Sequence, residues 1–372
     1  MIPVLPGRTG GPALADIYKG HDNLFTLIRL LLAGAVLLEH AFIHRLPVSA
    51  SAPLEWHDIS LSYGGVNAFF ILSGFLISDS LRRRRSYEAY AAARILRIYP
   101  ALIALVFAAI FIVGPFFTAL TPTDYWFSPE MWRFPFETLT FVNGEGGPPG
   151  TFPSSERPGE FSASLWTLRY EVIAYIGLPI FAAIPLVSGR WGQLILFLTL
   201  SALYEILLAT GGQTVWSATF VSLVRLGACF SLGMTIFTFR EHLKVVWLIP
   251  ALLTFLWLFL TGETIAGEFT ANLMIAGWMF TLAFASGWAI KRLKTMPDYS
   301  YGLYIWHWPA MQIGGELFPE AGAFGILAFS IPVTMLFSMF SWHLIERPAL
   351  GSKKRLAALI ERVVGRHKQQ GN

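Results

Sequence analysis

The segment LFTLIRLLLAGAVLLEHAFI at residues 24–43 decides the fold class, because only Arg29, Glu39 and His40 in it are ionisable. A helix needs roughly 20 mostly apolar residues to cross the hydrocarbon core of a bilayer. This segment therefore predicts a membrane-spanning helix. Nine further stretches have the same character: 63–80, 98–118, 164–186, 192–209, 217–238, 245–261, 270–290, 299–316 and 322–345. We predict an all-α membrane protein with about ten transmembrane helices.

The composition of the chain agrees with this class. Of the 372 residues, 55% are hydrophobic and 13% are charged, and the mean hydropathy is +0.56. Soluble domains average about 25% charged residues. The single cysteine, Cys229, excludes an intrachain disulfide and a cysteine-only metal site. We expect no metal site, no tightly bound cofactor and no nucleic-acid partner, and the polar residues 1–23 show no cleavable signal.

The distribution of Lys and Arg predicts the orientation of the helices. With a cytoplasmic N-terminus, 21 Lys and Arg lie in cytoplasmic segments, and only Arg45, Arg133 and Arg157 lie on the opposite side. Positive residues collect on the cytoplasmic side of membrane proteins. We therefore predict that both termini are cytoplasmic, with residues 1–23 as an N-terminal segment and 349–372 as a basic tail.

The one long connection, residues 119–163, lies on the outer side in this topology. It is rich in Pro, Gly and aromatic residues. A segment of this length in a compact protein is usually a lid or a binding loop, or else disordered. Its composition argues against a separate folded domain, so we treat 1–372 as a single membrane domain.

Ionisable side chains within the predicted spans are candidates for function, since a charge at mid-membrane costs several kcal/mol. Arg29 and His40 are eleven residues apart, which returns to within about 20° of the same helical face after a rise of about 16 Å. Glu39 points about 100° away from that face. A snorkelling arginine and an interfacial histidine are the alternative interpretation. Glu205 and Arg225 fit a structural ion pair between adjacent helices.

A second pattern lies in the cytoplasmic stretch RRRRSYEAYAAARILRIYP. Arg94 and Arg97 are three residues apart and share one helical face. Such a pair can bind a phosphate through two planar guanidinium groups, which a single Lys cannot do. The alternative is the ordinary positive charge of cytoplasmic loops, and this explanation is favoured for Arg82–Arg85.

Six segments, in this order, resemble a known family. They are IRLLLAGAVLLEH at 28–40, GGVNAFFILSGFLI at 64–77, ARILRIYP at 93–100, SLWTLRYEVIAYIGLP at 164–179, YSYGLYIWHWP at 299–309 and HLIERP at 343–348. Together they resemble the integral-membrane acyltransferase-3 family, bacterial O-acyltransferases that modify surface glycans and related molecules. The resemblance covers nearly the whole chain, so 1–372 is expected to be one acyltransferase domain.

The family's motifs can be placed on this sequence one position at a time. The Arg-(ten residues)-His motif falls on Arg29 and His40, and the Arg-x-x-Arg motif on Arg94 and Arg97. The Ser-Gly-Phe element falls on 73–75, where a glycine within a helix permits close approach of a second backbone.

The Trp-Ser-Leu-x-x-Glu element of the family reads Trp166, Thr167, Leu168 and Glu171 in this chain. Thr167 stands in place of the usual Ser, and Arg169 in place of a small polar residue. These departures put the local acceptor contacts in doubt and leave the family resemblance intact.

The resemblance implies transfer of an acyl group, commonly acetyl, from cytoplasmic acyl-CoA to a sugar hydroxyl on the periplasmic side of a bacterial inner membrane. His40 would act as general base, since a near-neutral imidazole suits this task. Arg29 and Glu171 complete the expected catalytic set, and Arg94, Arg97 and Arg29 would bind the donor. The expected acceptor-binding residues are Trp166, Tyr170, Trp306 and His307.

Several alternatives remain open at this stage. The tryptophans Trp166, Trp306 and Trp308 also fit an aromatic belt at the membrane interface. A transporter or flippase of a glycan, lipid or drug would need similar charges, but the sequence shows no inverted repeat. A non-catalytic scaffold is a third interpretation. The expected partners are acyl-CoA, a glycan or oligosaccharide acceptor and the lipid bilayer, and a homo-oligomer is left open.

Overall fold

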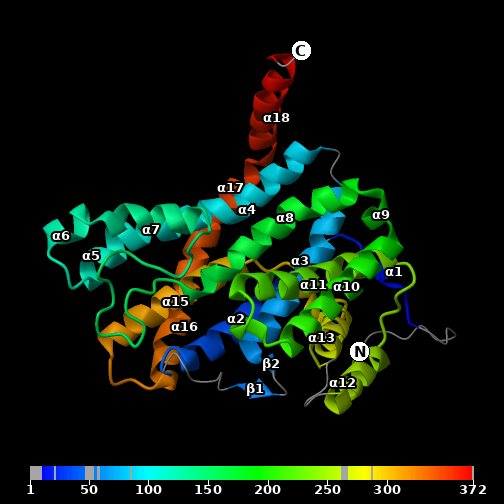
Figure 1. Cartoon of the computed structure of the whole chain (residues 1–372), viewed down its shortest axis with the longest axis horizontal. Coiled ribbons are helices and arrows are strands. Elements are labelled where there is room, and N and C mark those ends of the chain that lie inside the picture. Colours follow the sequence, from blue (N-terminus) through cyan, green and yellow to red (C-terminus); the bar gives the residue numbers. More distant parts are fainter. Residues whose placement is uncertain are drawn as a thin grey trace. The chain divides into compact units, whose positions relative to one another are not determined.

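The computed structural model describes residues 11–20, 22–46, 54–56, 59–83, 86–260, 267–285 and 288–370. Within these ranges the chain is built from helices (Figure 1). The one sheet described pairs two short strands, β1 (Glu55–Trp56) and β2 (Ile59–Ser60), in antiparallel register with Glu55 opposite Ser60. The all-α class predicted from hydropathy is therefore confirmed.

Six helical stretches in the described residues are long and apolar enough to cross a membrane. They are α2 (Phe25–Ile43), α3 (Leu61–Arg83), Tyr87–Phe117, α10 (Arg190–Ala209), α11 (Ala218–Phe239) and Ala323–Gly351. The third stretch comprises α4 (Tyr87–Ala108), the π-helix η1 (Ala109–Val113) and α5 (Gly114–Phe117), and the last comprises α16 (Ala323–Phe340), the π-helix η4 (Ser341–Glu346) and α17 (Arg347–Gly351). These helices make the protein a multi-pass membrane protein.

The other four predicted spans also coincide with helices, but these are shorter or less apolar. They are α8 (Leu168–Ala183), α12 (Leu248–Leu260), α13 (Gly267–Ala283) and α15 (Ser300–Leu317). Thirteen residues in α12 give a rise of only about 20 Å, against a hydrocarbon core of about 30 Å. The count of ten and the cytoplasmic termini therefore stay predictions.

The chain folds into two compact units. Unit 1 comprises Met1–Val36, Leu54–Ser80 and Tyr170–Asp298, and unit 2 comprises Leu37–Pro53, Leu81–Arg169 and Tyr299–Asn372. The boundary passes through α2, so this helix gives Arg29 to unit 1 and His40 to unit 2. The remaining short elements are α1 (Leu14–Ile17), α9 (Pro185–Ser188), the 3-10 turn η3 (Gly212–Thr214) and α14 (Trp288–Leu293).

Within unit 1, α3 and α11 approach each other closely through two glycines. A Cβ added at Gly74 would lie 2.0 Å from the carbonyl oxygen of Phe230, and one at Gly233 would lie 2.0 Å from that of Ile71. The close approach predicted for the Ser-Gly-Phe element is therefore confirmed. Phe75, the third residue of this element, is fully buried, and its ring packs against Phe25, Phe237 and Phe280.

Within unit 2, the long connection 119–163 is folded. It forms α6 (Pro122–Phe127), α7 (Pro129–Leu139) and then leads into the 3-10 turn η2 (Ala163–Thr167). Tyr125 donates a 2.8 Å hydrogen bond to the carbonyl of Ile110, and the buried rings of Phe152 and Phe161 stack at 6.2 Å. The disordered alternative is therefore wrong for this segment.

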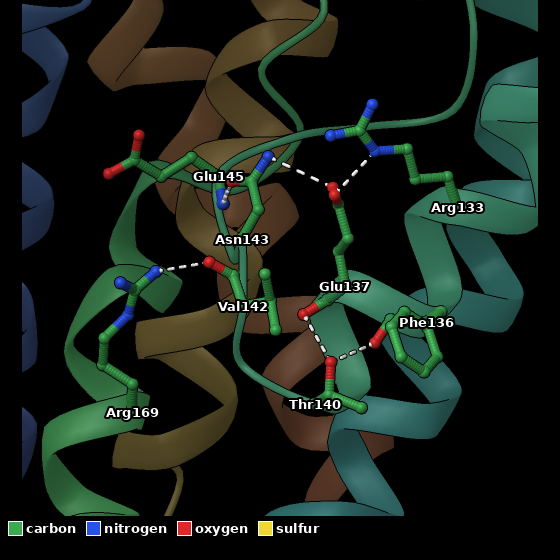
Figure 2. Close-up of polar contacts among 8 residues, drawn as sticks. All are labelled: Arg133, Phe136, Glu137, Thr140, Val142, Asn143, Glu145 and Arg169. Atoms are coloured by element: carbon green, nitrogen blue, oxygen red, sulfur yellow. Dashed lines mark hydrogen bonds and ion pairs between the residues drawn. The ribbon is translucent and has the colours of Figure 1, made fainter.

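A polar network fixes the part of this connection that follows α7 (Figure 2). Arg133 Nε lies 2.6 Å from Glu137 Oε1, and the Asn143 amide reaches the other carboxylate oxygen of Glu137. Arg169, at the start of α8, donates a 2.9 Å hydrogen bond to the carbonyl of Val142. Arg169 thus has a structural role in holding the connection to unit 2.

The basic tail is also helical over its described residues. Helix α18 (Lys353–Gln370) follows α17 and packs against α4. The helix is drawn in red at the C-terminal end of the chain in Figure 1.

Candidate functional site

Two histidines from distant parts of the sequence meet in unit 2. His40, near the end of α2, has its Nδ1 2.8 Å from Nε2 of His307 on α15. The Nδ1 of His307 lies 3.1 Å from the carbonyl oxygen of Leu303, one turn earlier in the same helix. His307 is fully buried, while His40 is partly exposed.

These two contacts determine the tautomers of the neutral imidazoles. A carbonyl oxygen only accepts, so Nδ1 of His307 carries the hydrogen and its Nε2 holds a lone pair. That lone pair accepts from the Nδ1–H of His40. Nε2 of His40 is consequently the unprotonated nitrogen, and none of the described residues hydrogen-bonds to it. This arrangement gives His40 a free basic nitrogen and a fixed ring orientation.

The indole of Trp308 forms a wall beside this pair. It is fully buried, and its ring stands edge-on to His40 at 5.3 Å and to His44 at 5.7 Å between centroids. Trp308 therefore packs on the histidines from within the protein and is not part of a lipid-facing aromatic belt. Trp306 is 7% exposed and stacks on Phe337 of α16 at 5.0 Å, so that ring face cannot also contact a sugar.

Residues 154–167 run antiparallel along α15, and we call this segment the strap. At its C-terminal end, Ser164 Oγ donates to the carbonyl of Tyr304, and the Tyr304 hydroxyl donates to the carbonyl of Ser164, both at 2.9 Å. Thr167 Oγ1 lies 2.7 Å from the same Tyr304 hydroxyl. At its other end, the Ser154 amide donates to Glu316 at 3.0 Å. The strap thus covers the stretch of α15 that carries His307.

The middle of the strap is held by Gln312, which is fully buried. Its Nε2 donates to the carbonyls of Arg157, at 2.7 Å, and Glu160. Its Oε1 accepts from Ser155 Oγ and from His44 Nε2, the latter at 2.8 Å. All four hydrogen-bonding positions of the amide are used, which is the condition for stable burial of a polar side chain.

Arg29 occupies unit 1 and pairs with a carboxylate that sequence analysis did not single out. Its Nη2 lies 3.0 Å from Oδ2 of Asp298, with the two side chains 25% and 13% exposed. Asp298 lies two residues before the start of α15, the helix that carries His307. The structure therefore places Arg29 in an ion pair, and its predicted role toward the donor stays a prediction.

Arg94 and Arg97 lie on α4 in unit 2, as their spacing predicts. Nη1 of Arg97 lies 3.6 Å from Oε2 of Glu346, which is 2% exposed and whose Oε1 accepts from Ser341 Oγ at 2.8 Å. The Arg97 guanidinium also lies over the Tyr301 ring, 5.5 Å from its centroid. The guanidinium of Arg94 lies 6.0 Å from the Tyr90 ring centroid. A buried carboxylate thus offsets the charge of Arg97.

The remaining predicted site residues lie around the start of α8. Glu171 accepts a short hydrogen bond from the Tyr175 hydroxyl one turn later in the same helix. Tyr170 is buried, and Trp166 in η2 is partly buried. The group that contacts the His40 imidazole in unit 2 is His307, and the roles expected of Glu171, Tyr170 and Trp166 stay predictions.

Comparison with known proteins now decides the family. A family profile described as an acyltransferase domain, Acyl_transf_3, matches residues 23–343. The chain belongs to this acyltransferase family. The resemblance drawn from the six sequence segments is therefore confirmed, and the protein is a multi-pass membrane acyltransferase.

The chain is also similar to three curated proteins. The chain is 27% identical to nodulation protein 10 of Rhizobium leguminosarum bv. viciae, over 91% of this chain and 96% of that protein. It is 25% identical to an O-acetyl transferase of Shigella phage Sf6, over 88% and 95%. It is 24% identical to a putative peptidoglycan O-acetyltransferase of Bacillus subtilis, over 76% of this chain and 50% of that protein. No solved structure matches the chain.

A second buried polar cluster in this acyltransferase lies in unit 1. The Tyr63 hydroxyl donates to Oε2 of Glu268, whose Oε1 accepts from Asn67 at 3.0 Å. Tyr204 lies 2.7 Å from the Tyr63 hydroxyl. The guanidinium of Arg225 lies over the Tyr63 ring, 3.8 Å from its centroid. The sequence pointed to Glu205 as the carboxylate for Arg225, whereas the carboxylate in this cluster is Glu268.

Sequence analysis missed three residues that shape the site: Gln312, Asp298 and Glu346. Gln312 carries no charge, so a search for ionisable groups in the spans passes over it. Asp298 lies at the edge of a predicted span and Glu346 one residue beyond another. Asp298 and Glu346 could have been found by looking for carboxylates near the ends of the spans as partners for the arginines.

Proposed function

We propose that this acyltransferase transfers an acyl group, most simply acetyl, from acyl-CoA to a hydroxyl group of a glycan. The observation that carries the proposal is the His40–His307 pair, which leaves Nε2 of His40 as a free base. Two relatives support the choice of acetyl and of an oxygen acceptor, because they are named an O-acetyl transferase and a putative peptidoglycan O-acetyltransferase.

In the proposed reaction, Nε2 of His40 takes the proton of the acceptor hydroxyl as its oxygen attacks the thioester carbon. An oxygen–carbon bond forms, and the carbonyl oxygen becomes negatively charged in a tetrahedral intermediate. When the intermediate collapses, the carbon–sulfur bond breaks and the CoA thiolate takes the proton from His40. General bases of this kind contribute about 10²–10⁴-fold to a reaction rate.

His307 supports this role through the hydrogen bond that it accepts. When His40 gains a proton at Nε2, its Nδ1–H points at the lone pair of His307, which stabilises the positive ring. The fixed orientation also removes the need to order the imidazole during the reaction. His307, predicted from the sequence as an acceptor-binding residue, is thus better explained as the partner of the base.

The donor and acceptor sides of the proposal follow from charge. Arg94 and Arg97 lie in the arginine-rich region that the positive-inside rule assigns to the cytoplasm, where acyl-CoA is present. A guanidinium group suits a CoA phosphate, and Arg94 is the proposed donor contact, since Arg97 already pairs with Glu346. The strap belongs to the connection assigned to the periplasmic side, where a surface glycan would be met. The proposed location is the inner membrane of a bacterium.

The experiment is an acyl-transfer assay with the full-length protein in proteoliposomes. Radiolabelled acetyl-CoA and a peptidoglycan or oligosaccharide fraction are supplied, and label in the glycan is measured for wild type and His40→Gln. Label that enters the glycan with the wild type and not with the variant supports the proposal. Wild-type turnover in His40→Gln removes His40 from the chemistry, and no label with any acyl-CoA overturns the proposed donor.

A further inference from the structure

The strap brings an arginine to the end of α2 that carries the proposed base. Nη2 of Arg157 donates a 3.4 Å hydrogen bond to the carbonyl of Ile43, the last residue of α2 and three residues after His40. Nη1 of Arg157 lies 3.8 Å from Oε1 of Glu160, three residues along the strap.

The backbone that carries this arginine is fixed. Gln312 Nε2 donates two hydrogen bonds to the strap, to the carbonyls of Arg157 and Glu160. Ser155 Oγ binds both Gln312 and the amide nitrogen of Arg157, the latter at 3.2 Å. Gln312, which binds the backbone of Arg157, and His307, which binds the proposed base, both lie on α15. One helix therefore positions both Arg157 and His40. A charged donor held in this way needs no rearrangement when charge develops on the substrate.

The guanidinium retains a hydrogen-bond donor for a ligand. The Nε–H of Arg157 is buried and meets no acceptor among the described residues, and the side chain is 13% exposed. A buried donor without a partner is costly, about 1–3 kcal/mol. The unused donor belongs to a fixed cation at the end of the helix that carries the general base, so it is suited to an acceptor that arrives with the substrate.

We propose that Arg157 is a further catalytic residue, whose guanidinium donates hydrogen bonds to the thioester carbonyl oxygen as that oxygen becomes negatively charged. The inference rests on the proposed acyl transfer at His40. In the balanced reaction, the new oxygen–carbon bond places the negative charge on this oxygen, and the charge disappears when the carbon–sulfur bond breaks. Removing one donor to such an oxyanion typically lowers kcat by about 10²–10³-fold.

A purely structural role for Arg157, as a tie between the strap and α2, predicts different behaviour. A tie contributes to folding stability and leaves kcat unchanged in the folded protein. Arg45 provides a matched control, since its Nη2 donates a 2.8 Å hydrogen bond to the carbonyl of Phe318 in the same unit. It too joins two segments through an arginine and a carbonyl.

The test compares wild type, Arg157→Gln, Arg157→Lys and Arg45→Gln in proteoliposomes, with kcat and KM measured for acetyl-CoA and for the glycan. Arg157→Gln is expected to lower kcat about 10²–10³-fold with little change in either KM, and Arg157→Lys to recover part of the loss. Slow hydrolysis of acetyl-CoA without acceptor should fall in parallel, because water attack produces the same oxyanion. Arg45→Gln should keep the wild-type kcat.

A kcat of Arg157→Gln within about threefold of wild type overturns the inference, as does a loss matched by Arg45→Gln together with a lower melting temperature. An effect on the KM of the glycan alone also overturns it and makes Arg157 an acceptor-binding residue. If Arg157→Gln does not fold, Arg157→Lys decides, and wild-type kcat in that variant refutes the role. Failure of the proposed function is distinguishable, because wild type itself would then transfer no label.

Discussion

The two buried polar clusters of this acyltransferase differ in how completely their hydrogen-bonding atoms are used. In unit 1, both carboxylate oxygens of Glu268 accept hydrogen bonds, from Tyr63 and Asn67, and Arg225 stacks on the Tyr63 ring. In unit 2, three of the four ring nitrogens of the His40–His307 pair form hydrogen bonds. The fourth, Nε2 of His40, forms none with the described residues. A charge buried in a membrane protein is therefore not itself a sign of chemistry. An atom with an unused lone pair beside an ordered partner is the better sign.

The largest effect expected from this contrast is the loss of activity in His40→Ala. Without Nε2 there is no base, so kcat should fall by about 10²–10⁴-fold, while the lost hydrogen bond to buried His307 should cost about 1–3 kcal/mol of stability. The check is initial-rate kinetics beside thermal unfolding. His343→Ala is the matched control, since that imidazole contacts Tyr299 elsewhere in unit 2 and should leave kcat unchanged. Substantial turnover in His40→Ala would show that Nε2 of His40 is not the base.

A second prediction concerns pH and His44, which lies just beyond α2. Burial lowers the pKa of His44 to about 4, against an ordinary value of 6.5. The unfolded chain therefore binds a proton as pH falls from 6.5 to 4, whereas the folded protein does not, and stability is lost across this window. The shift corresponds to roughly 3 kcal/mol at the acid end.

Replacing His44 by Gln should flatten the decline of stability between pH 6.5 and 4, since the variant has no proton to bind at this position. The measurement is the melting temperature as a function of pH for wild type and His44→Gln. Identical pH profiles for the two proteins would show that burial does not keep His44 neutral in this pH range.

The third prediction addresses the cluster in unit 1. Glu268→Ala leaves the hydroxyl of Tyr63 and the amide of Asn67 without their acceptor, so stability should fall by about 2 kcal/mol. Because both oxygens of Glu268 are already used, kcat of the folded protein should stay at the wild-type value. Glu241→Ala serves as control, since that side chain is 68% exposed. A loss of kcat at an unchanged melting temperature would make this cluster functional.

The sequence predicts the parts of this protein that depend on local composition. Ten apolar stretches coincide with helices, and the stretch 24–43 correctly places Arg29 and His40 on one helix, α2. The contacts between distant residues could not be predicted in this way. His307 is 267 residues from His40, and their contact depends on how α15 packs against α2. No periodicity within either helix contains that information, and the same holds for Gln312 and the strap.

The smallest expected effect is a difference between Arg94 and Arg97, for which the sequence pattern predicts the same role in phosphate binding. The charge of Arg97 is offset by Glu346, which is 2% exposed. Arg97→Ala should therefore act mainly on stability, because it leaves a buried carboxylate without its cation. Arg94→Ala should weaken CoA binding about tenfold at low salt and less at high salt, since phosphate contacts near water are screened. Titration of CoA into both variants at two salt concentrations, with thermal unfolding alongside, measures the difference.

Equal losses of CoA affinity in the two variants would show that Glu346 does not remove Arg97 from donor binding. Unchanged affinity in both would assign the pair to the positive charge that orients the protein in the membrane.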